Sequence, residues 1–328
     1  MKIIPSSKRH RYAARIGVFL VAATLIAGMV GAYGAGSGYT LAQSQNLEIQ
    51  DWYDLDAVRD NLSGNHTLMN DLDSTTAGYE ELASPTANQG EGWDPIGFYG
   101  SAPSSGCGPT PEMLQWFGLT GTFDGQGHEI HDLFINRPGE DYVGLFGSVD
   151  EGGIIKDVGV VNATVTGGWM VGGLVGWNEY TVSNSYSSGN VNGGAVVGGL
   201  MGANDGTVSD SYSSGNVTGE DGVGGLVGDN YGTVSNSYST GSVYGSDYVG
   251  GLVGDNAGDV NNSFWDTETS GQATSDGGTG KNTTEMQDIA TFSGAGWDII
   301  AATPGSTNTT YIWNIINGLT YPFLSWQS

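Results

Sequence analysis

The sequence of 328 residues contains a single cysteine, Cys107, so it has no intrachain disulfide framework. Because Cys107 lies in a loop rich in serine, glycine and proline, we expect an ordinary surface or half-buried thiol and not a nucleophile. Proline is also scarce, with nine residues against 57 glycines. This balance, together with regularly spaced β-forming residues, indicates many short strands joined by tight turns and argues against disorder.

Basic residues are rare beyond the N-terminus. Five of the nine lysines and arginines lie in the first fifteen residues, and the remainder carries four against 35 acidic residues, a formal balance of −31. No lysine, arginine or histidine lies between Lys156 and Lys281. Such a surface repels nucleic acid, which excludes that class of partner. The acidity suits a high-salt medium, where repulsion is screened, or serves only to keep a glycine-rich chain soluble.

Long apolar stretches are absent from the sequence except near the N-terminus. There a basic cluster ending at Arg15 precedes the apolar residues 16–30, and small residues follow. This order is typical of a secretory signal, and we predict a signal peptide over residues 1–35 with cleavage between Ala32 and Ala35. An uncleaved anchor is the alternative, although the apolar run is short for the ~20 residues that a membrane span needs. We therefore expect a secreted or cell-surface protein.

The dominant feature of the sequence is a repeat of 26 residues, which recurs from Val171 to about Trp265. Each copy opens with Val-Gly-Gly and carries a leucine, then a valine, then an aromatic residue at fixed positions. The leucines are Leu174, Leu200, Leu226 and Leu252, the valines are Val182, Val208, Val234 and Val260, and the aromatic residues are Tyr186, Tyr212, Tyr238 and Phe264. A degenerate copy opens at Val143.

A repeat of this length is too short for a four-stranded propeller blade, which takes about 40–45 residues. It suits one coil of an all-β solenoid with three short strands, stacked on its neighbours at about 4.8 Å. We expect the leucines, valines and aromatic residues to form columns that face inward. Between valine and aromatic lies a polar column, which we place at an outward bend because burying the unpaired carboxylate of Asp210 is costly. Its members are Asn184, Asp210, Asn236 and Asn262.

A stack of coils needs a cover at each end. Near the N-terminus Asp54 can cap a short helix in which Leu55, Val58 and Leu62 share one face. The predicted organisation is a signal peptide (1–35), an N-terminal cap with the first coils and a loop insertion (36–116), a β-helix (117–266) and a C-terminal cap (267–328).

Aromatic residues concentrate again in the C-terminal cap. We expect them to form a hydrophobic plug over the last coil, and sugar binding through stacked rings is the alternative. These residues are Phe292, Trp297, Tyr311, Trp313, Tyr321, Phe323 and Trp326.

Catalytic motifs fit this chain poorly. The segment from His128 to His131 differs from the His-Glu-x-x-His zinc motif because its histidines are three apart and it is predicted to be a strand. A glycosidase or lyase would need two or more carboxylates facing one groove. The acids near enough in sequence are Asp71, Asp73, Asp94, Asp124, Glu129 and Asp132, and nothing singles out a pair. We therefore assign no catalytic, cofactor-binding or metal-binding residue.

Calcium and glycans are the remaining candidate groups. Turns rich in aspartate and asparagine offer the oxygen ligands that calcium prefers, and Asp229 and Asp255 would stack, but the calcium-binding nonapeptide Gly-Gly-x-Gly-x-Asp is missing. We expect no cofactor. Seven Asn-x-Ser/Thr sequons are candidate glycan sites, although this composition also produces such triplets by chance. They lie at Asn61, Asn65, Asn162, Asn216, Asn261, Asn282 and Asn308.

The repeat resembles the GLUG motif, a short repeat of secreted bacterial and archaeal proteins. The likeness rests on Gly173-Leu174-Val175-Gly176 and its successors, on the Asn-x-Gly and Ser-Tyr-Ser elements, and on the flanks at 123–128 and 264–272. It covers most of residues 50–328. The resemblance implies a right-handed parallel β-helix in a host-binding or cell-surface setting. Members include adhesin-like proteins and parts of IgA-cleaving metallopeptidases, whose catalytic motif this chain lacks.

We therefore predict a non-catalytic, secreted or cell-surface structural and adhesion module. Its expected partners are cell-surface glycans or surface proteins, because long faces of serine, threonine and asparagine suit weak, multivalent contacts. Membrane contact is expected only through the N-terminal segment, if that segment is uncleaved. The alternative is a carbohydrate-active β-helix enzyme that works from residues 74–132.

Overall fold

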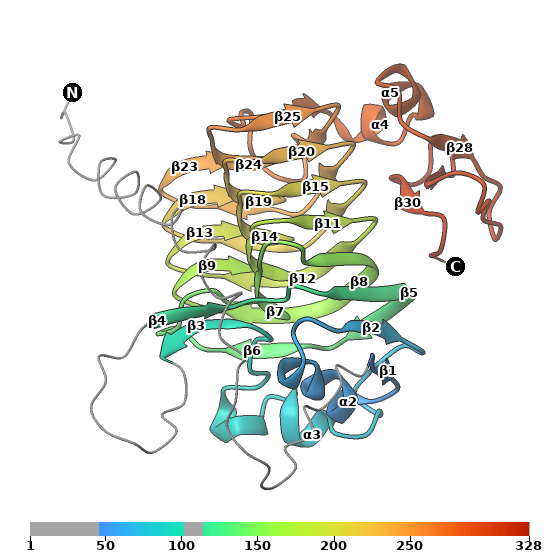
Figure 1. Cartoon of the computed structure of the whole chain (residues 1–328). Coiled ribbons are helices and arrows are strands. Elements are labelled where there is room, and N and C mark those ends of the chain that lie inside the picture. Colours follow the sequence, from blue (N-terminus) through green and yellow to red (C-terminus); the bar gives the residue numbers. More distant parts are fainter. Residues whose placement is uncertain (1–45, 102–113, 328) are drawn as a thin grey trace, which may run out of the picture. The chain divides into compact units, whose positions relative to one another are not determined.

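The computed structural model describes residues 46–101 and 114–327, which form a parallel β-solenoid with few helices (Figure 1). The predicted fold class is thereby confirmed. The predicted signal peptide and Cys107 lie outside the described residues. The two ends of the loop insertion pair as antiparallel strands β3 (Phe98–Ser101) and β4 (Leu114–Phe117). Among the residues described, no helix is long and apolar enough to span a membrane.

Short helices and strands form the N-terminal cap. They are β1 (Glu48–Ile49), α2 (Trp52–Asp56), the 3-10 helix η1 (Ala57–Asp60), β2 (Asn65–Leu68), α3 (Tyr79–Leu82) and the 3-10 helix η2 (Ala87–Gly90). The predicted helix is present, but its N-cap is Asp51 and not Asp54. The Asp51 carboxylate accepts a hydrogen bond from the Asp54 backbone N–H at 2.9 Å, so Asp54 already lies inside the first turn.

The pairing of the parallel strands arranges them in five walls around the solenoid, and Figure 1 labels most strands of the first three. The first wall holds β9 (Trp169–Gly172), β13 (Ala195–Gly198), β18 (Asp221–Gly224) and β23 (Asp247–Gly250). The second holds β7 (Phe146–Val149), β10 (Val175–Asn178), β14 (Met201–Asn204), β19 (Val227–Asn230) and β24 (Val253–Asn256). The third holds β11 (Thr181–Ser183), β15 (Thr207–Ser209), β20 (Thr233–Ser235) and β25 (Asp259–Asn261).

The remaining two walls complete each coil. The fourth holds β12 (Tyr186–Asn192), β16 (Tyr212–Ser213), β21 (Tyr238–Ser239), β26 (Phe264–Asp266) and β27 (Thr279–Lys281). The fifth holds β6 (Phe134–Asn136), the end of β12, β17 (Asn216–Thr218) and β22 (Val243–Tyr244). Two long strands of the lower coils, β5 (Thr122–His131) and β8 (Ile154–Thr166), cross more than one wall.

A coil such as β13 to β17 therefore contains five short strands where the sequence predicted three. The middle run is broken at the polar column, whose members adopt a left-handed backbone with φ between 47° and 50°. Asparagine and aspartate tolerate this conformation best after glycine. The predicted outward bend is confirmed, since Asp210 is only half-buried and its carboxylate accepts a hydrogen bond from the Trp313 indole.

The interior is built by residues 26 positions apart that pair in register, such as Val175 with Met201 and Val182 with Val208. The predicted inward direction of the leucine column is confirmed, because all four leucines are fully buried. In the valine column Val182, Val208 and Val234 are fully buried, and Val260 at the last coil is partly buried. Burying one such side chain stabilises the fold by about 1.5–3 kcal/mol, and each coil relies on the next to do so.

Two polar ladders also run through the interior. Asn178 donates to Asn204 at 2.8 Å, Asn204 to Asn230 at 2.8 Å and Asn230 to Asn256 at 2.7 Å. The buried serines one residue before the aromatic column form the second ladder, in which Ser185 N–H donates to the Ser211 hydroxyl at 3.2 Å and later coils repeat the bond. Because buried polar groups are costly when unpaired, these ladders fix the coil register.

The structure corrects the predicted direction of the aromatic column. Tyr186, Tyr212, Tyr238 and Phe264 do not join the interior cluster and belong to a second hydrophobic cluster with residues from the C-terminal segment. The physical reason lies in the preceding serine: Ser185 faces inward, so strand alternation turns Tyr186 outward. Tyr186 and Tyr212 stack at 4.7 Å, and Tyr212 and Tyr238 at 4.9 Å, which is close to the coil spacing.

The C-terminal region also differs from the predicted plug. Residues 267–281 cover the last coil, where Asp276 N–H donates to Val253 O and Gly251 N–H to Thr274 O. The later residues, 282–327, lie along the side of the stack, and we call them the C-terminal strap (Figure 1). Its elements are α4 (Thr283–Met286), α5 (Ile289–Gly294), β28 (Ile299–Ala301), β29 (Trp313–Ile315) and β30 (Phe323–Leu324). Five of the seven aromatic residues therefore cover a face and not the end: Phe292, Trp297, Trp313, Tyr321 and Trp326.

Candidate functional site

The C-terminal strap covers the outward tyrosine column, which we call the tyrosine ladder (Tyr186, Tyr212, Tyr238 and Phe264). Polar contacts fix the strap at successive coils. The Tyr238 hydroxyl donates to Pro322 O at 2.5 Å, and Gln327 Nε2 donates to the Tyr212 hydroxyl at 2.8 Å. Burial raises the pKa of Tyr238 and of Tyr212 above the ordinary tyrosine value, so both hydroxyls stay protonated.

Three tryptophans of the strap hold the left-handed column beside the ladder. Trp297 Nε1 donates to Asn262 O at 2.7 Å, Trp313 Nε1 to Asp210 Oδ1 at 3.3 Å and Trp326 Nε1 to Asn184 O at 3.3 Å. Later residues of the strap therefore contact earlier coils, so the strap runs back along the stack from the last coil. An indole N–H needs a partner when buried, which the outward bends supply.

The tyrosine ladder ends at Tyr186. The residue below it in register is Gly159, and a Cβ there would lie 2.4 Å from the Tyr186 ring, so only glycine leaves room for it. Below Gly159 comes Glu129, whose carboxylate accepts hydrogen bonds from the Tyr186 hydroxyl and lies 3.1 Å from His131 Nε2. Below Tyr186, at the lower end of the strap, the column of aromatic side chains is therefore followed by polar residues.

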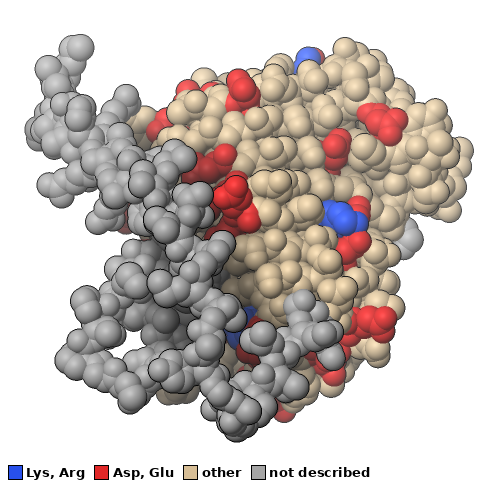
Figure 2. Space-filling view, viewed as in Figure 1, with Lys and Arg blue, Asp and Glu red and all other residues tan. Residues whose placement is uncertain are grey.

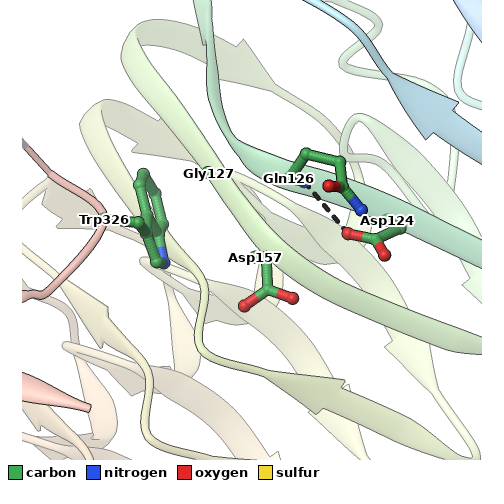
Figure 3. Close-up of a pocket in the computed structure, with 5 residues that line it drawn as sticks. All are labelled: Asp124, Gln126, Gly127, Asp157 and Trp326. Carbon is green, nitrogen blue, oxygen red and sulfur yellow. Dashed lines mark hydrogen bonds between the residues drawn. The ribbon is translucent and has the colours of Figure 1, made fainter. Parts of the chain in front are cut away.

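A hollow of about 200 Å³ lies at this junction (Figure 3). We call it the Trp326 pocket, and its lining residues are Asp124, Gln126, Gly127, Asp157 and Trp326. It exists because β5 bulges between Asp124 and His128, where Gln126 and Gly127 adopt a left-handed backbone with φ of 53° and 83°. A Cβ on Gly127 would lie 2.9 Å from the Trp326 side chain, so glycine allows the two to pack.

Lys156 joins the two carboxylates of the pocket. Its Nζ lies 2.5 Å from Asp124 Oδ2 and 3.1 Å from Asp157 Oδ2. Burial lowers the pKa of Lys156, but the bonds to Asp124 and Asp157 raise it by more, so its pKa lies above the usual lysine value. Asp124 also accepts from Gln126 N–H at 3.0 Å, and Asp157 accepts from the Asn184 amide. Both carboxylates are therefore held in fixed orientations.

The six acidic residues that were candidate catalytic residues in the sequence all bond other side chains of the same chain. Those partners are His128 for Asp71, Thr75 and Thr76 for Asp73, Arg59 and Arg137 for Asp94, Lys156 for Asp124, Tyr186 and His131 for Glu129, and Asn162 for Asp132. Asp71, Asp124 and Glu129 lie on or beside β5, whereas Asp94 bonds arginines near the N-terminal cap. Only Asp124 of the six lines the pocket.

The predicted strand over His128 and His131 is confirmed as part of β5. The two histidines bond different carboxylates, since His128 Nδ1 lies 3.0 Å from Asp71 Oδ1 while His131 bonds Glu129. Within the described part of the chain, no group of three or more histidine, cysteine, aspartate or glutamate side chains is arranged to hold a metal ion.

Acidic residues gather on the second wall and the corner after it. Asp150, Glu179 and Asp205 each follow a paired strand end, so they stack in successive coils. The predicted stacking of Asp229 on Asp255 is confirmed by their register. Burial and the charge of Asp255 raise the pKa of Asp229 to about 7. Figure 2 shows acidic side chains spread over the described surface with few lysines and arginines among them.

The predicted glycan sites differ in accessibility. Asn65, Asn162, Asn216, Asn261 and Asn282 are exposed, whereas Asn61 and Asn308 are half-buried. Asn282 also caps α4, because its side chain accepts from Glu285 N–H at 2.9 Å. A glycan there would compete with the cap, and modification of these sites stays a prediction.

Sequence reasoning named two of the pocket residues, Asp124 among the acids and Trp326 among the aromatic residues, without bringing them together. It missed Gln126, Gly127 and Asp157. One signal was available: Asp157 precedes Asn184 by one degenerate repeat, and both occupy the left-handed column. The position of Trp326 had no such signal, since the strap does not repeat.

Comparisons with known proteins agree with this architecture. The family described as "The GLUG motif" matches residues 167–192 and 219–244. Among solved structures, a Bacteroides ovatus protein described as a "putative immunoglobulin A1 protease" has a TM-score of 0.56 and 18% identity, covering 87% of this chain and 94% of that one. At that identity the likeness supports the fold alone.

Two curated proteins are similar in sequence. "Halomucin" from Haloquadratum walsbyi is 31% identical over 160 residues, which is 48% of this chain and 2% of Halomucin. A "Putative Gly-rich membrane protein" from Evansella cellulosilytica is 31% identical over 135 residues, which is 40% of this chain and 13% of that protein. The chain thus spans only a small part of each relative. The matched repeats and the stacked coils together show that this chain carries GLUG-motif repeats in a parallel β-solenoid fold.

Proposed function

We propose that this chain is a non-catalytic structural and adhesion module, secreted or held at a cell surface. One observation carries the proposal: every acid considered as a catalytic residue is bonded to a side chain of its own chain. A glycosidase needs one carboxyl group that donates a proton to the leaving group and another that attacks the sugar or activates water.

The surface supports the same proposal. The repeating corners present serine, threonine and asparagine side chains at the spacing of the coils, as in the exposed pair in which Asn216 donates to Asn190 at 3.1 Å. Identical groups at a fixed spacing favour many weak contacts with a polymer, and such contacts multiply through effective concentration. The names of the two curated relatives, a mucin-like name and a membrane protein, are consistent with a surface location.

A carbohydrate-active enzyme is the second candidate. It is favoured by the Trp326 pocket, where the carboxylates of Asp124 and Asp157 lie on either side of one lysine. The two candidates differ in one outcome, because an adhesin retains a polysaccharide whereas an enzyme cleaves it.

The test is to incubate the purified chain with a panel of polysaccharides and to measure both retention and newly formed reducing ends. The proposal expects retention of at least one polysaccharide without release. Release that disappears in an Asp124→Asn variant would overturn the adhesion function and establish the enzyme. Because a lyase also leaves an unsaturated sugar, absorbance of the products is recorded in the same samples.

A further inference from the structure

The Trp326 pocket has a composition that the proposed function does not yet explain. One wall is the apolar indole of Trp326, whose ring centroid lies 5.7 Å from that of Tyr186. The opposite side carries two carboxylates, and the exposed Gln126 amide lies beside them (Figure 3). A ligand that fits must therefore present an apolar surface to one side and polar groups to the other.

The hydrogen bonds that the pocket residues already make indicate which kind of polar group a ligand must carry. A carboxylate offers about four acceptor positions. Asp124 uses its oxygens for Gln126 N–H and Lys156, and Asp157 uses its own for Lys156 and Asn184. Acceptor positions therefore remain, while the lysine and the side-chain N–H group of Asn184 already donate to these carboxylates. A ligand that fits this pocket should therefore donate several hydrogen bonds.

The volume and the net charge of the pocket narrow the class of ligand further. A volume of about 200 Å³ is smaller than the roughly 300–1,000 Å³ of pockets for drug-sized ligands, so it holds one small ring. Two carboxylates and one lysine leave the pocket with a net negative charge, which repels a uronic acid or a sulfated sugar. A neutral sugar ring has an apolar face of C–H groups and hydroxyl donors around its edge.

We propose that the Trp326 pocket is a subsite for one neutral pyranose residue of a glycan, bound against the Trp326 indole with its hydroxyls donating to Asp124 and Asp157. This inference rests on the proposed adhesion function and gives that function a location. The carboxylates are held in place before the ligand arrives, by Lys156, Asn184 and the β5 bulge, which lowers the entropy cost of binding.

The chain offers a matched pair of variants. Asp157 and Asp210 occupy the same left-handed column two coils apart, and the coils between and beyond carry asparagine there. Asp157→Asn removes the pocket carboxylate at a backbone position that asparagine tolerates. Asp210→Asn makes the same change outside the pocket. A third variant, Gln126→Ala, alters an exposed side chain and cannot remove core contacts, so it serves if Asp157→Asn fails to fold.

The experiment is saturation-transfer NMR on the full chain with methyl glycosides of glucose, galactose and mannose, with methyl glucuronide as the charged comparator. We expect saturation transfer to at least one neutral glycoside. Asp157→Asn should raise the Kd for that glycoside by at least about tenfold, and Gln126→Ala should raise it by about two- to tenfold. Asp210→Asn should leave the Kd unchanged.

Three results would overturn the subsite: no transfer to any neutral glycoside, equal binding by the parent and Asp157→Asn, or stronger binding of methyl glucuronide than of every neutral glycoside. These failures differ from failure of the adhesion function. A chain that retains polysaccharide equally well with Asp157→Asn would keep the function and lose the subsite, whereas release of reducing ends would remove the function itself.

Discussion

The interior of the solenoid and its tyrosine ladder are made by the same repeat, but they are completed in different ways. Inside, each Leu226-type residue is buried by copies of itself in the coils above and below. Outside, the tyrosines stack equally regularly, yet they are buried only because the C-terminal strap covers them. Neighbouring repeats therefore bury the interior, whereas the tyrosine ladder is buried by a segment that occurs once.

This difference has an energetic consequence. A defect in the interior affects the coil and both neighbours, because stability in repeat proteins is a sum of coil and interface contributions. A defect on the ladder affects the bond between one coil and the strap, as at Tyr238 and Pro322. Changes in the interior should therefore cost more than polar changes under the strap, and these should cost more than changes on the acidic wall.

The largest effect is expected for Leu226→Ala. Leu226 is fully buried in the middle of the stack, and its truncation leaves a cavity that the rigid coils cannot close. We expect a loss of about 2–5 kcal/mol in the free energy of unfolding. Chemical denaturation followed by circular dichroism measures it. A loss below about 1 kcal/mol would show that the interior is loosely packed.

An intermediate effect is expected for Tyr238→Phe. Removing this hydroxyl leaves the Pro322 carbonyl without its donor beneath the strap, which costs about 1–3 kcal/mol. Tyr244→Phe is the matched control, since Tyr244 is 78% exposed and its change should leave the midpoint of unfolding where it is. Equal midpoints for the two variants would contradict the covered ladder.

The smallest effect is expected on the acidic wall. Burial and Asp255 raise the pKa of Asp229 to about 7, so the folded state holds this proton more tightly than the unfolded state. Between about pH 4 and pH 7 its contribution to stability therefore falls as pH rises. We expect Asp229→Asn to flatten this dependence, by about 1 kcal/mol or less because the side chain is partly exposed.

Thermal unfolding of the parent and Asp229→Asn across that pH range isolates the effect. The difference between the two chains is needed, because burial lowers the pKa of His66 and gives an opposite slope. High salt should shrink the difference, since it screens Asp229 from Asp255 and Asp221. A parent chain whose stability relative to that of Asp229→Asn rises with pH would contradict the assignment.

The sequence was sufficient for what repetition determines. The period of 26 residues, the buried leucine column and the outward bend at Asn184 and Asp210 all follow from composition at fixed positions. The direction of Tyr186 could not be predicted in the same way. It depends on whether one or two residues turn at the bend, and the left-handed Asn184 shifts the alternation so that Ser185 faces inward.

The candidate site was less predictable than the fold. Asp124 and Trp326 are separated by most of the chain, and the strap that joins them carries no repeat from which its register could be read. The bulge that places Gln126 and Gly127 also interrupts an otherwise regular strand. Contacts made once, between segments far apart, leave no periodic signal in a single sequence.

In this structure the C-terminal strap covers the tyrosine ladder. Hydroxyl-radical footprinting with mass spectrometry tests it directly, because it compares tyrosines within one sample. Tyr238 and Tyr212 are 2% and 8% exposed, whereas Tyr244 and Tyr231 are 78% and 50% exposed. We expect slow oxidation of the first pair and fast oxidation of the second. Oxidation of Tyr212 and Tyr238 as fast as that of Tyr244 would contradict it.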